Sequence, residues 1–187
     1  MRQDFKPGTM IYPLPAVLVS CGNDESEYNV FTVAWTGTIC SNPPMCYISV
    51  RPSRHSYPII KKNMEFVINL TTAEMARATD WCGVRSGDDY NKFKEMNLTP
   101  GKCSIVKAPL IEESPLCIEC RVKEVMSLGS HDMFIADVVN IRIDDKYMQE
   151  DGRFDLAASG LMAYVHGGYF NLGNKIGKFG WSVEKKK

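Results

Sequence analysis

The side chains best suited to bind an anion lie in the segment CSNPPMCYISVRPSRHSYPII, which spans residues 40–60. Arg51 and Arg54 come just before Ser56, where a short helix is expected to begin. A helix start offers free N–H groups, arginine offers a planar fork of donors, and serine adds a neutral donor. This combination predicts a phosphate-binding site. A solvated turn whose serine caps the helix would use the same residues, so both interpretations stay open.

Strand and helix patterns indicate which elements hold these residues in place. Runs rich in Val, Ile, Phe and Tyr, broken by Gly, Asn and Pro, predict strands at residues 16–20, 30–35, 45–51 and 65–70. Because side chains alternate between the faces of a strand, the third strand presents Tyr47, Ser49 and Arg51 on one face. The spacing of apolar residues and the helix-start signals predict helices at residues 56–63, 72–81 and 89–96.

Two longer alternating patterns follow, at residues 116–126 and 132–143, and predict antiparallel strands that are buried on one face. In the first, Leu116, Ile118, Cys120 and Val122 alternate with Cys117, Glu119, Arg121 and Lys123. In the second, we expect one face to hold Met133, Ile135, Val139, Ile141 and Ile143. Strands that gather around helices without regular βαβ alternation favour a mainly β (α+β) barrel. Residues 1–187 are interpreted as one domain with an aromatic, glycine-rich arm from about residue 155.

Composition argues against several classes of function. The 22 lysines and arginines balance 22 aspartates and glutamates, so the chain has no broad positive field for nucleic acid. The sequence shows neither a secretory signal nor an apolar run of membrane-spanning length, which predicts a cytoplasmic protein without a membrane partner. Seven cysteines, an odd number, fit reduced thiols. The one CxxC, from Cys117 to Cys120, lies in a strand that turns its thiols to opposite faces, so no metal site is expected.

Two further residues could border a ligand, although each also has a structural interpretation. His131 stands at the start of a strand, where a histidine is either structural or catalytic. Trp35 ends a strand, and a tryptophan there is either part of the core or the edge of a site for a planar ligand. The glycine motifs of dinucleotide-binding folds and phosphate-binding loops are absent from the sequence, as is the serine elbow of hydrolases.

Several motifs, taken in order, resemble the flavin reductase-like family, and in particular its flavoredoxin branch. The first half of the resemblance lies in PLPAVLVS, NVFTVAWTG, the Pro43-Pro44 turn, ISVRPSRHS and EFVINL. The second half lies in WCGVRSGDDYNKF and KAPLIEESPLCIECRVKEVMSLGSHDMFIADV, and the later YVHGGYFNLG is also similar. The resemblance covers roughly residues 8–145, and it depends on the order of the motifs more than on any single one.

The resemblance implies an FMN-binding split β-barrel of Greek-key type with flanking helices, which works as a homodimer. It implies that the flavin ring lies against Asn29, Thr32, Val33, Ala34, Trp35 and Thr36. The ribityl chain and the phosphate would be surrounded by Ser49, Val50, Arg51, Arg54 and Ser56, and the flavin would also be reached by Lys92. The open face of the ring, where hydride transfer would occur, would be framed by Trp35, His131 and Tyr164.

The same resemblance leaves three functions open. The first is reduction of bound FMN by NAD(P)H, with the electrons passed to a redox protein or a small acceptor. The second is electron transfer through FMN without a pyridine-nucleotide site, and the third is a flavin-less binding module. Ala136 stands where many members of the family have glycine, and its methyl group is expected to narrow the space over the ring. This departure counts against use of a bulky nicotinamide.

Overall fold

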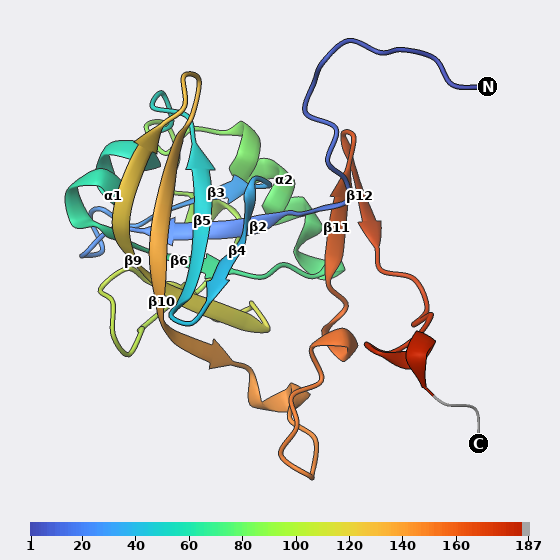
Figure 1. Cartoon of the computed structure of the whole chain (residues 1–187). Coiled ribbons are helices and arrows are strands. Elements are labelled where there is room, and N and C mark those ends of the chain that lie inside the picture. The colour runs from blue at the N-terminus through green and yellow to red at the C-terminus, as the bar shows by residue number, and fades with distance from the viewer. Residues whose placement is uncertain (185–187) are drawn as a thin grey trace.

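The computed structural model describes residues 1–184 and shows one large antiparallel sheet with short helices around it (Figure 1). The sheet has seven strands in the order β3-β2-β6-β9-β10-β5-β4. These strands are β2 (Val17–Cys21), β3 (Asn29–Val33), β4 (Thr36–Ser41), β5 (Pro44–Val50), β6 (Glu65–Asn69), β9 (Leu116–Ser127) and β10 (Asp132–Ile143). The mainly β (α+β) class predicted from the sequence is confirmed.

The remaining elements surround this sheet. The helices are α1 (Ser56–Asn63), α2 (Ala76–Val84) and α3 (Lys92–Glu95), with 3-10 turns at Ala73–Met75, Asp145–Tyr147, Leu156–Ser159 and Trp181–Val183. One small sheet joins β1 (Leu14–Pro15), β11 (Met162–Val165) and β12 (Gly168–Asn171), and another joins β7 (Pro100–Gly101) and β8 (Leu110–Ile111). In the part of the chain that the structure describes, no helix is both long and apolar enough to cross a membrane.

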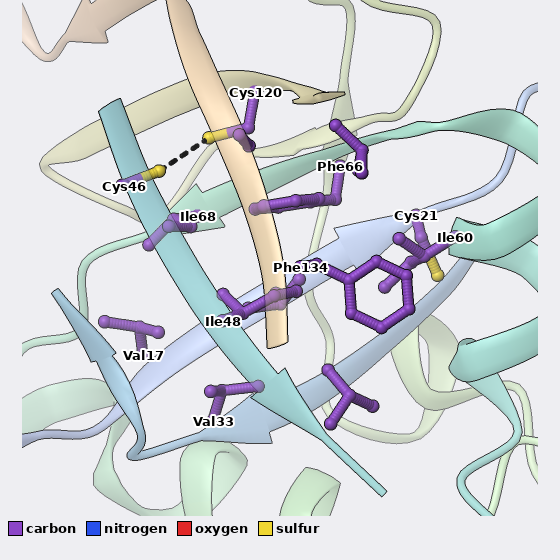
Figure 2. Close-up of a cluster of buried hydrophobic side chains, with 14 of the residues drawn as sticks. Val17, Cys21, Val33, Cys46, Ile48, Ile60, Phe66, Ile68, Cys120 and Phe134 are labelled. Carbon is purple, nitrogen blue, oxygen red and sulfur yellow. Dashed lines mark hydrogen bonds between the residues drawn. The ribbon is translucent and has the colours of Figure 1, made fainter. Parts of the chain in front are cut away.

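The main core lies inside the curled sheet, where six strands contribute buried side chains. Figure 2 shows Ile48, Phe66 and Phe134 packed together from three of these strands, and all three are fully buried. The alternation predicted for β5 is confirmed, because Ile48 and Val50 are buried whereas Ser49 is half-buried on the other face. This alternation turns the polar side of β5 outward, toward the surface that carries the candidate site.

The first half of β9 departs from the expected one-sided burial. Glu119 is fully buried, on the face opposite the barrel core. The N–H groups of Ser104, Ile105 and Val106 donate hydrogen bonds to its carboxylate over 3.0, 2.7 and 3.0 Å, and Asn140 Nδ2 donates over 2.7 Å. A buried charge is tolerated when it is fully hydrogen-bonded. The prediction is wrong here because the loop at residues 104–106 covers the second face of the strand.

The prediction of which face of β10 is buried is wrong for the first half of the strand. Met133 and Ile135 are only half-buried, whereas Phe134 and Ala136 lie in the barrel core. Both faces of this stretch carry apolar side chains, so alternation alone does not say which face meets the core. The pairing of β10 with β9 also shifts between Ile135 and Ala136, which interrupts the regular alternation along the strand.

The start of α1 is where the sequence predicted it, but Ser56 is not its cap. His55 occupies the N-cap position and makes no capping hydrogen bond with its side chain. Ser56 is the first helical residue, and its buried hydroxyl accepts a hydrogen bond from the side-chain amide of Asn29. Of the other predicted helices, α2 begins at Ala76 after a 3-10 turn, and α3 covers only the middle of residues 89–96.

The C-terminal arm contains a strand hairpin that the sequence did not predict. In this hairpin β11 pairs with β12, and its Tyr164 lies opposite Leu14 of β1. The hydroxyl of Tyr169 donates to the carboxylate of Asp80 over 3.2 Å, which joins the hairpin to α2. Figure 1 shows the hairpin beside the barrel, next to the N-terminal segment. The turn at His166 and Gly167, where both residues have positive φ, is a local signal for the hairpin, whereas its pairing partner β1 lies about 150 residues earlier in the chain and has no such signal.

Candidate functional site

Two adjoining cavities open where β3 and β5 end and α1 begins. The first, which we call the slot, has a volume of about 170 Å³ and is lined by Phe31, Thr32, Val33, Ala34, Trp35, Ser49, Val50, Arg51, Arg54 and His131. The second, which we call the basic cavity, has a volume of about 210 Å³ and is lined by Asn29, Phe31, Arg51, Ser53, Arg54, His55, Ser56, Val84, Arg85, Ser86, Gly87 and Lys92. The two cavities share Phe31, Arg51 and Arg54, so they lie side by side, and we call the two together the hollow.

The basic cavity begins at the turn between β5 and α1. The backbone N–H of Arg54 donates to the carbonyl oxygen of Arg51 over 3.0 Å, which closes this turn. Arg54 Nη1 donates to the carbonyl oxygen of Gly83 over 3.1 Å and so ties the turn to α2. Arg51, Arg54 and Ser56 therefore border the same hollow, two of them from a tight turn and one from the first position of a helix.

Positive charge accumulates in the basic cavity, where Arg51, Arg54, Arg85 and Lys92 all form part of the wall. Lys92 is only 4% exposed, and its Nζ donates to the carbonyl oxygen of Cys82 over 2.8 Å. Burial lowers the pKa of Lys92, and the charge of Arg54 lowers it further. Of the four cations only Lys92 is buried, whereas Arg51, Arg54 and Arg85 are exposed. An anion in this cavity would be stabilised by the charges of its wall.

The slot follows the backbone that leaves β3, from Thr32 to Trp35. The rings of Trp35 and His131 lie against each other at its edge, with centroids 4.6 Å apart and planes inclined by 39°. The backbone N–H of Ser49 donates to the carbonyl oxygen of Trp35 over 2.9 Å and holds this bend against β5. The slot thus has an extended backbone on one side and an aromatic pair at its rim.

His131 stands between the slot and the cations of the basic cavity. Burial lowers the pKa of His131, and the charges of Arg51 and Arg54 lower it further. The imidazole is therefore neutral near pH 7, with one nitrogen able to donate and the other able to accept. Apart from Arg51 and Arg54, which the slot shares with the basic cavity, its wall carries no charged side chains. A mostly uncharged slot beside a cationic cavity suits a ligand with a planar ring system at one end and an anionic group at the other. Within residues 1–184, no group of three or more His, Cys, Asp or Glu side chains is placed to hold a metal ion.

Most of the site residues predicted from the sequence line this hollow. They are Asn29, Thr32, Val33, Ala34, Trp35, Ser49, Val50, Arg51, Arg54, Ser56, Lys92 and His131. Thr36 lies just outside the slot at the start of β4, where its hydroxyl donates to the carbonyl oxygen of Tyr47 over 2.6 Å. Tyr164 lies outside both cavities on β11, with its ring centroid 6.4 Å from that of Tyr12 and 5.5 Å from that of Tyr169. Within one chain, Tyr164 therefore lies away from the slot.

Ala136 lies in the core of the barrel and not in the wall of the slot. Its side chain is fully buried, and the residue pairs with Cys46 of β5. The prediction that its methyl group narrows the space over a ring is wrong because β10 turns this side chain inward. The presence of alanine in place of the glycine of other family members therefore gives no argument against the binding of a nicotinamide.

Part of the wall was not predicted from the sequence, chiefly Phe31 and the loop that follows α2. This loop lies inside WCGVRSGDDYNKF, one of the motifs that carry the resemblance, so a signal for it was present. A side chain at Gly87 would place its Cβ 2.6 Å from Asn29 Oδ1 and 2.6 Å from His55 Cδ2. Only glycine lets the loop come this close to the start of α1.

Comparison with known proteins places the chain in a family. Residues 9–173 match the flavin reductase-like domain, and the chain therefore belongs to the flavin reductase-like domain family. The structure is similar to flavoredoxin of Desulfovibrio vulgaris (Miyazaki F), with a TM-score of 0.90 and 26% identity, over 98% of this chain and 100% of that one.

Two further similarities concern the fold and a named enzyme. The split-barrel domain of a Shewanella frigidimarina protein is similar at a TM-score of 0.79 and 24% identity, over 90% of this chain and 86% of that one. The split-barrel fold implied by the resemblance is thus confirmed. The FMN reductase (NADH) RutF of Enterobacter cloacae is 22% identical over 111 residues, which are 59% of this chain and 65% of that protein.

Proposed function

We propose that this chain binds FMN non-covalently in the hollow and transfers electrons through it. The observation that carries the proposal is the junction of the slot and the basic cavity at Phe31, Arg51 and Arg54. FMN combines a flat ring system with a terminal phosphate, and the hollow offers a slot that is uncharged apart from Arg51 and Arg54, next to a cavity lined by four cations. Membership of the flavin reductase-like domain family supports the same assignment.

The residues of the basic cavity would hold the phosphate. Arg51 and Arg54 would donate from guanidinium groups and Ser56 from a hydroxyl at a helix start, which are the donors that phosphate groups accept. Lys92 would add a further positive charge from its buried position in the wall. The backbone between Thr32 and Trp35 would hold the ring, largely through main-chain groups.

The rim of the slot would be the place where an electron donor approaches. Bound FMN supplies the redox chemistry, since its ring accepts a hydride and passes electrons on. Trp35 and His131 would orient the donor and exclude water at this rim. A neutral His131 could also exchange one proton with a neighbouring group. Tyr164 is not part of this proposed rim, because its ring lies beside that of Tyr12 and outside both cavities.

We propose reduction by NAD(P)H as the main activity. The relative RutF is named an FMN reductase (NADH), and the burial of Ala136 leaves the slot free of the obstruction expected from the sequence. The second candidate is an electron carrier without a pyridine-nucleotide site, which the similarity to flavoredoxin favours. The electrons would pass to a redox protein or a small acceptor. A homodimer remains a prediction from the family resemblance, and a cytoplasmic location remains a prediction from the sequence patterns.

Two measurements test the proposal. Purified protein, with or without added FMN, should show the visible absorption bands of a bound flavin after gel filtration. Anaerobic stopped-flow mixing with NADH and with NADPH should then bleach these bands. A bound flavin that neither donor bleaches would support the carrier, whereas a colourless protein that takes up no FMN would contradict both candidates.

A further inference from the structure

The outer wall of the basic cavity is a surface loop, residues 84–88, which we call the closing loop. Its first four residues line the cavity, and it follows directly on the end of α2. Val84, its one large apolar residue, is 71% exposed and gives the loop little hydrophobic anchoring. The position of the loop therefore depends on polar contacts and on the close approach of Gly87 to Asn29 and His55.

The end of the closing loop is joined to the start of α1 through one side-chain pair. His55 Nδ1 lies 2.7 Å from Asp88 Oδ1, and the other carboxylate oxygen of Asp88 accepts a hydrogen bond from the Ser86 hydroxyl over 2.7 Å. The backbone N–H of Asp88 donates in turn to Ser86 Oγ over 3.2 Å. The hydrogen bonds from Ser86 and His55 lower the pKa of Asp88, so its carboxylate is charged at neutral pH.

We propose that the His55–Asp88 pair holds the closing loop shut over the basic cavity and thereby sets how slowly the phosphate end of the flavin leaves. The inference rests on the proposed FMN site. His55 belongs to the wall formed by the turn before α1, whereas Asp88 belongs to the loop on the opposite side. A ligand that occupies the cavity between these two walls leaves more easily when the walls separate. The pair would thus lengthen the time for which FMN stays bound.

The charge of Asp88 makes the proposal testable. When this carboxylate is removed, the change in charge and the loss of loop closure predict opposite effects on the rate of FMN release. Asp88→Asn removes a carboxylate from the neighbourhood of the phosphate, and this change in charge alone would slow the release of FMN. The variant also has one acceptor oxygen where Asp88 has two, so it cannot keep the separate contacts with His55 and Ser86, and the weaker hold on the loop would instead speed the release of FMN. Exposed pairs of this kind have modest strength, so we expect release to become about 2- to 5-fold faster.

The experiment compares release rates of two flavins from wild-type protein and from D88N, by the recovery of flavin fluorescence on dilution. FMN should leave D88N faster, whereas riboflavin, which has no phosphate, should leave both proteins at the same rate. Asp89→Asn is the matched control, since this neighbouring exposed residue carries the same charge but does not pair with His55. D89N should release FMN no faster than the wild type does.

Two results would overturn the inference. One is release of FMN from D88N at the wild-type rate or more slowly, and the other is an equal acceleration of riboflavin. In both results the protein still binds FMN, so neither of them would contradict the proposed function. Failure of the wild-type protein to bind FMN would overturn the proposed function and the role of the pair together. Circular dichroism of D88N would show that the substitution, at an exposed position, leaves the fold unchanged.

Discussion

Beneath the basic cavity, the side-chain amide of Asn29 donates a hydrogen bond to the hydroxyl of Ser56, with Nδ2 and Oγ 2.7 Å apart. Asn29 is the first residue of β3 and Ser56 the first residue of α1, so the bond joins the strand that leads into the slot to the helix that borders the cavity. Both residues are buried, at 4% and 1% exposure. Because Ser56 accepts this bond, its own proton remains available for another acceptor.

Ser56→Ala should destabilise the protein because it leaves the buried amide of Asn29 without its acceptor. An unsatisfied buried donor costs about 1–3 kcal/mol, and the free energy of unfolding should fall by that amount. Urea denaturation followed by circular dichroism measures the difference. Ser53→Ala, at an exposed position of the same cavity wall, is the control and should change the free energy little. Equal stability of S56A and the wild type would show that the bond between Asn29 and Ser56 contributes nothing.

Arg54→Ala should weaken FMN binding by about 1.5–3 kcal/mol, a factor of roughly 10 to 150 in Kd, because a charge-assisted hydrogen bond to the phosphate is lost. Arg54→Lys keeps the charge but lacks the planar fork of donors, so its affinity for FMN should lie between those of the wild type and R54A. Fluorescence titration with FMN measures the affinities. Arg77→Ala, an exposed arginine of α2 outside the cavity, should bind as the wild type does. Wild-type affinity in R54A would remove the basis for a phosphate site here.

Arg51→Ala should raise the pKa of His131 toward its ordinary value of 6.5, because one of the charges that oppose protonation is gone. Burial remains the larger cause, so the pKa should stay below that value. Binding of FMN to the wild-type protein should shift the pKa in the same direction, since the phosphate offsets the arginines. NMR titration of the His131 ring protons measures both changes. An unchanged or lower pKa in R51A would contradict the electrostatic account of this histidine.

Glu119→Ala should lower the free energy of unfolding by about 3 kcal/mol, because it leaves one buried and two part-buried N–H groups of the covering loop without an acceptor. Glu124→Ala, at an exposed position of the same strand, should change it by no more than about 0.5 kcal/mol. Chemical denaturation at pH 7 compares the two variants with the wild type. A loss in E119A no larger than that in E124A would contradict the role assigned to the buried carboxylate.

The same carboxylate predicts how stability depends on pH. Burial alone would raise the pKa of Glu119, but hydrogen bonds from Asn140 and from three backbone N–H groups lower it below its ordinary 4.5. The charged form therefore stabilises the fold fully above pH 4.5, and this contribution is lost as the pH falls through the lower pKa of the folded state. Glu119→Gln should lack this part of the acid dependence. If the free energy of unfolding fell equally with pH in E119Q and in the wild type, the role assigned to the Glu119 charge would be contradicted.

Local sequence patterns were enough to predict the elements that carry most of the candidate site. Alternation placed Ile48 and Val50 on the face opposite Ser49, because successive side chains of a strand point to opposite sides whatever surrounds the strand. Arg51, Arg54 and Ser56 could be grouped because they follow one another between a strand and a helix. The family resemblance added Asn29, which is distant in sequence but borders the same hollow.

Other features were decided only by tertiary structure. Glu119 is buried because the loop at residues 104–106 covers its face of β9, and Phe134 rather than Met133 enters the core although both are apolar. The hairpin of the arm pairs with β1 near the other end of the chain, and the closing loop meets the start of α1 through His55 and Asp88. Each of these outcomes depends on groups that only folding brings together. A side chain carries its chemistry in the sequence, but its burial and its partners are set by segments far away along the chain.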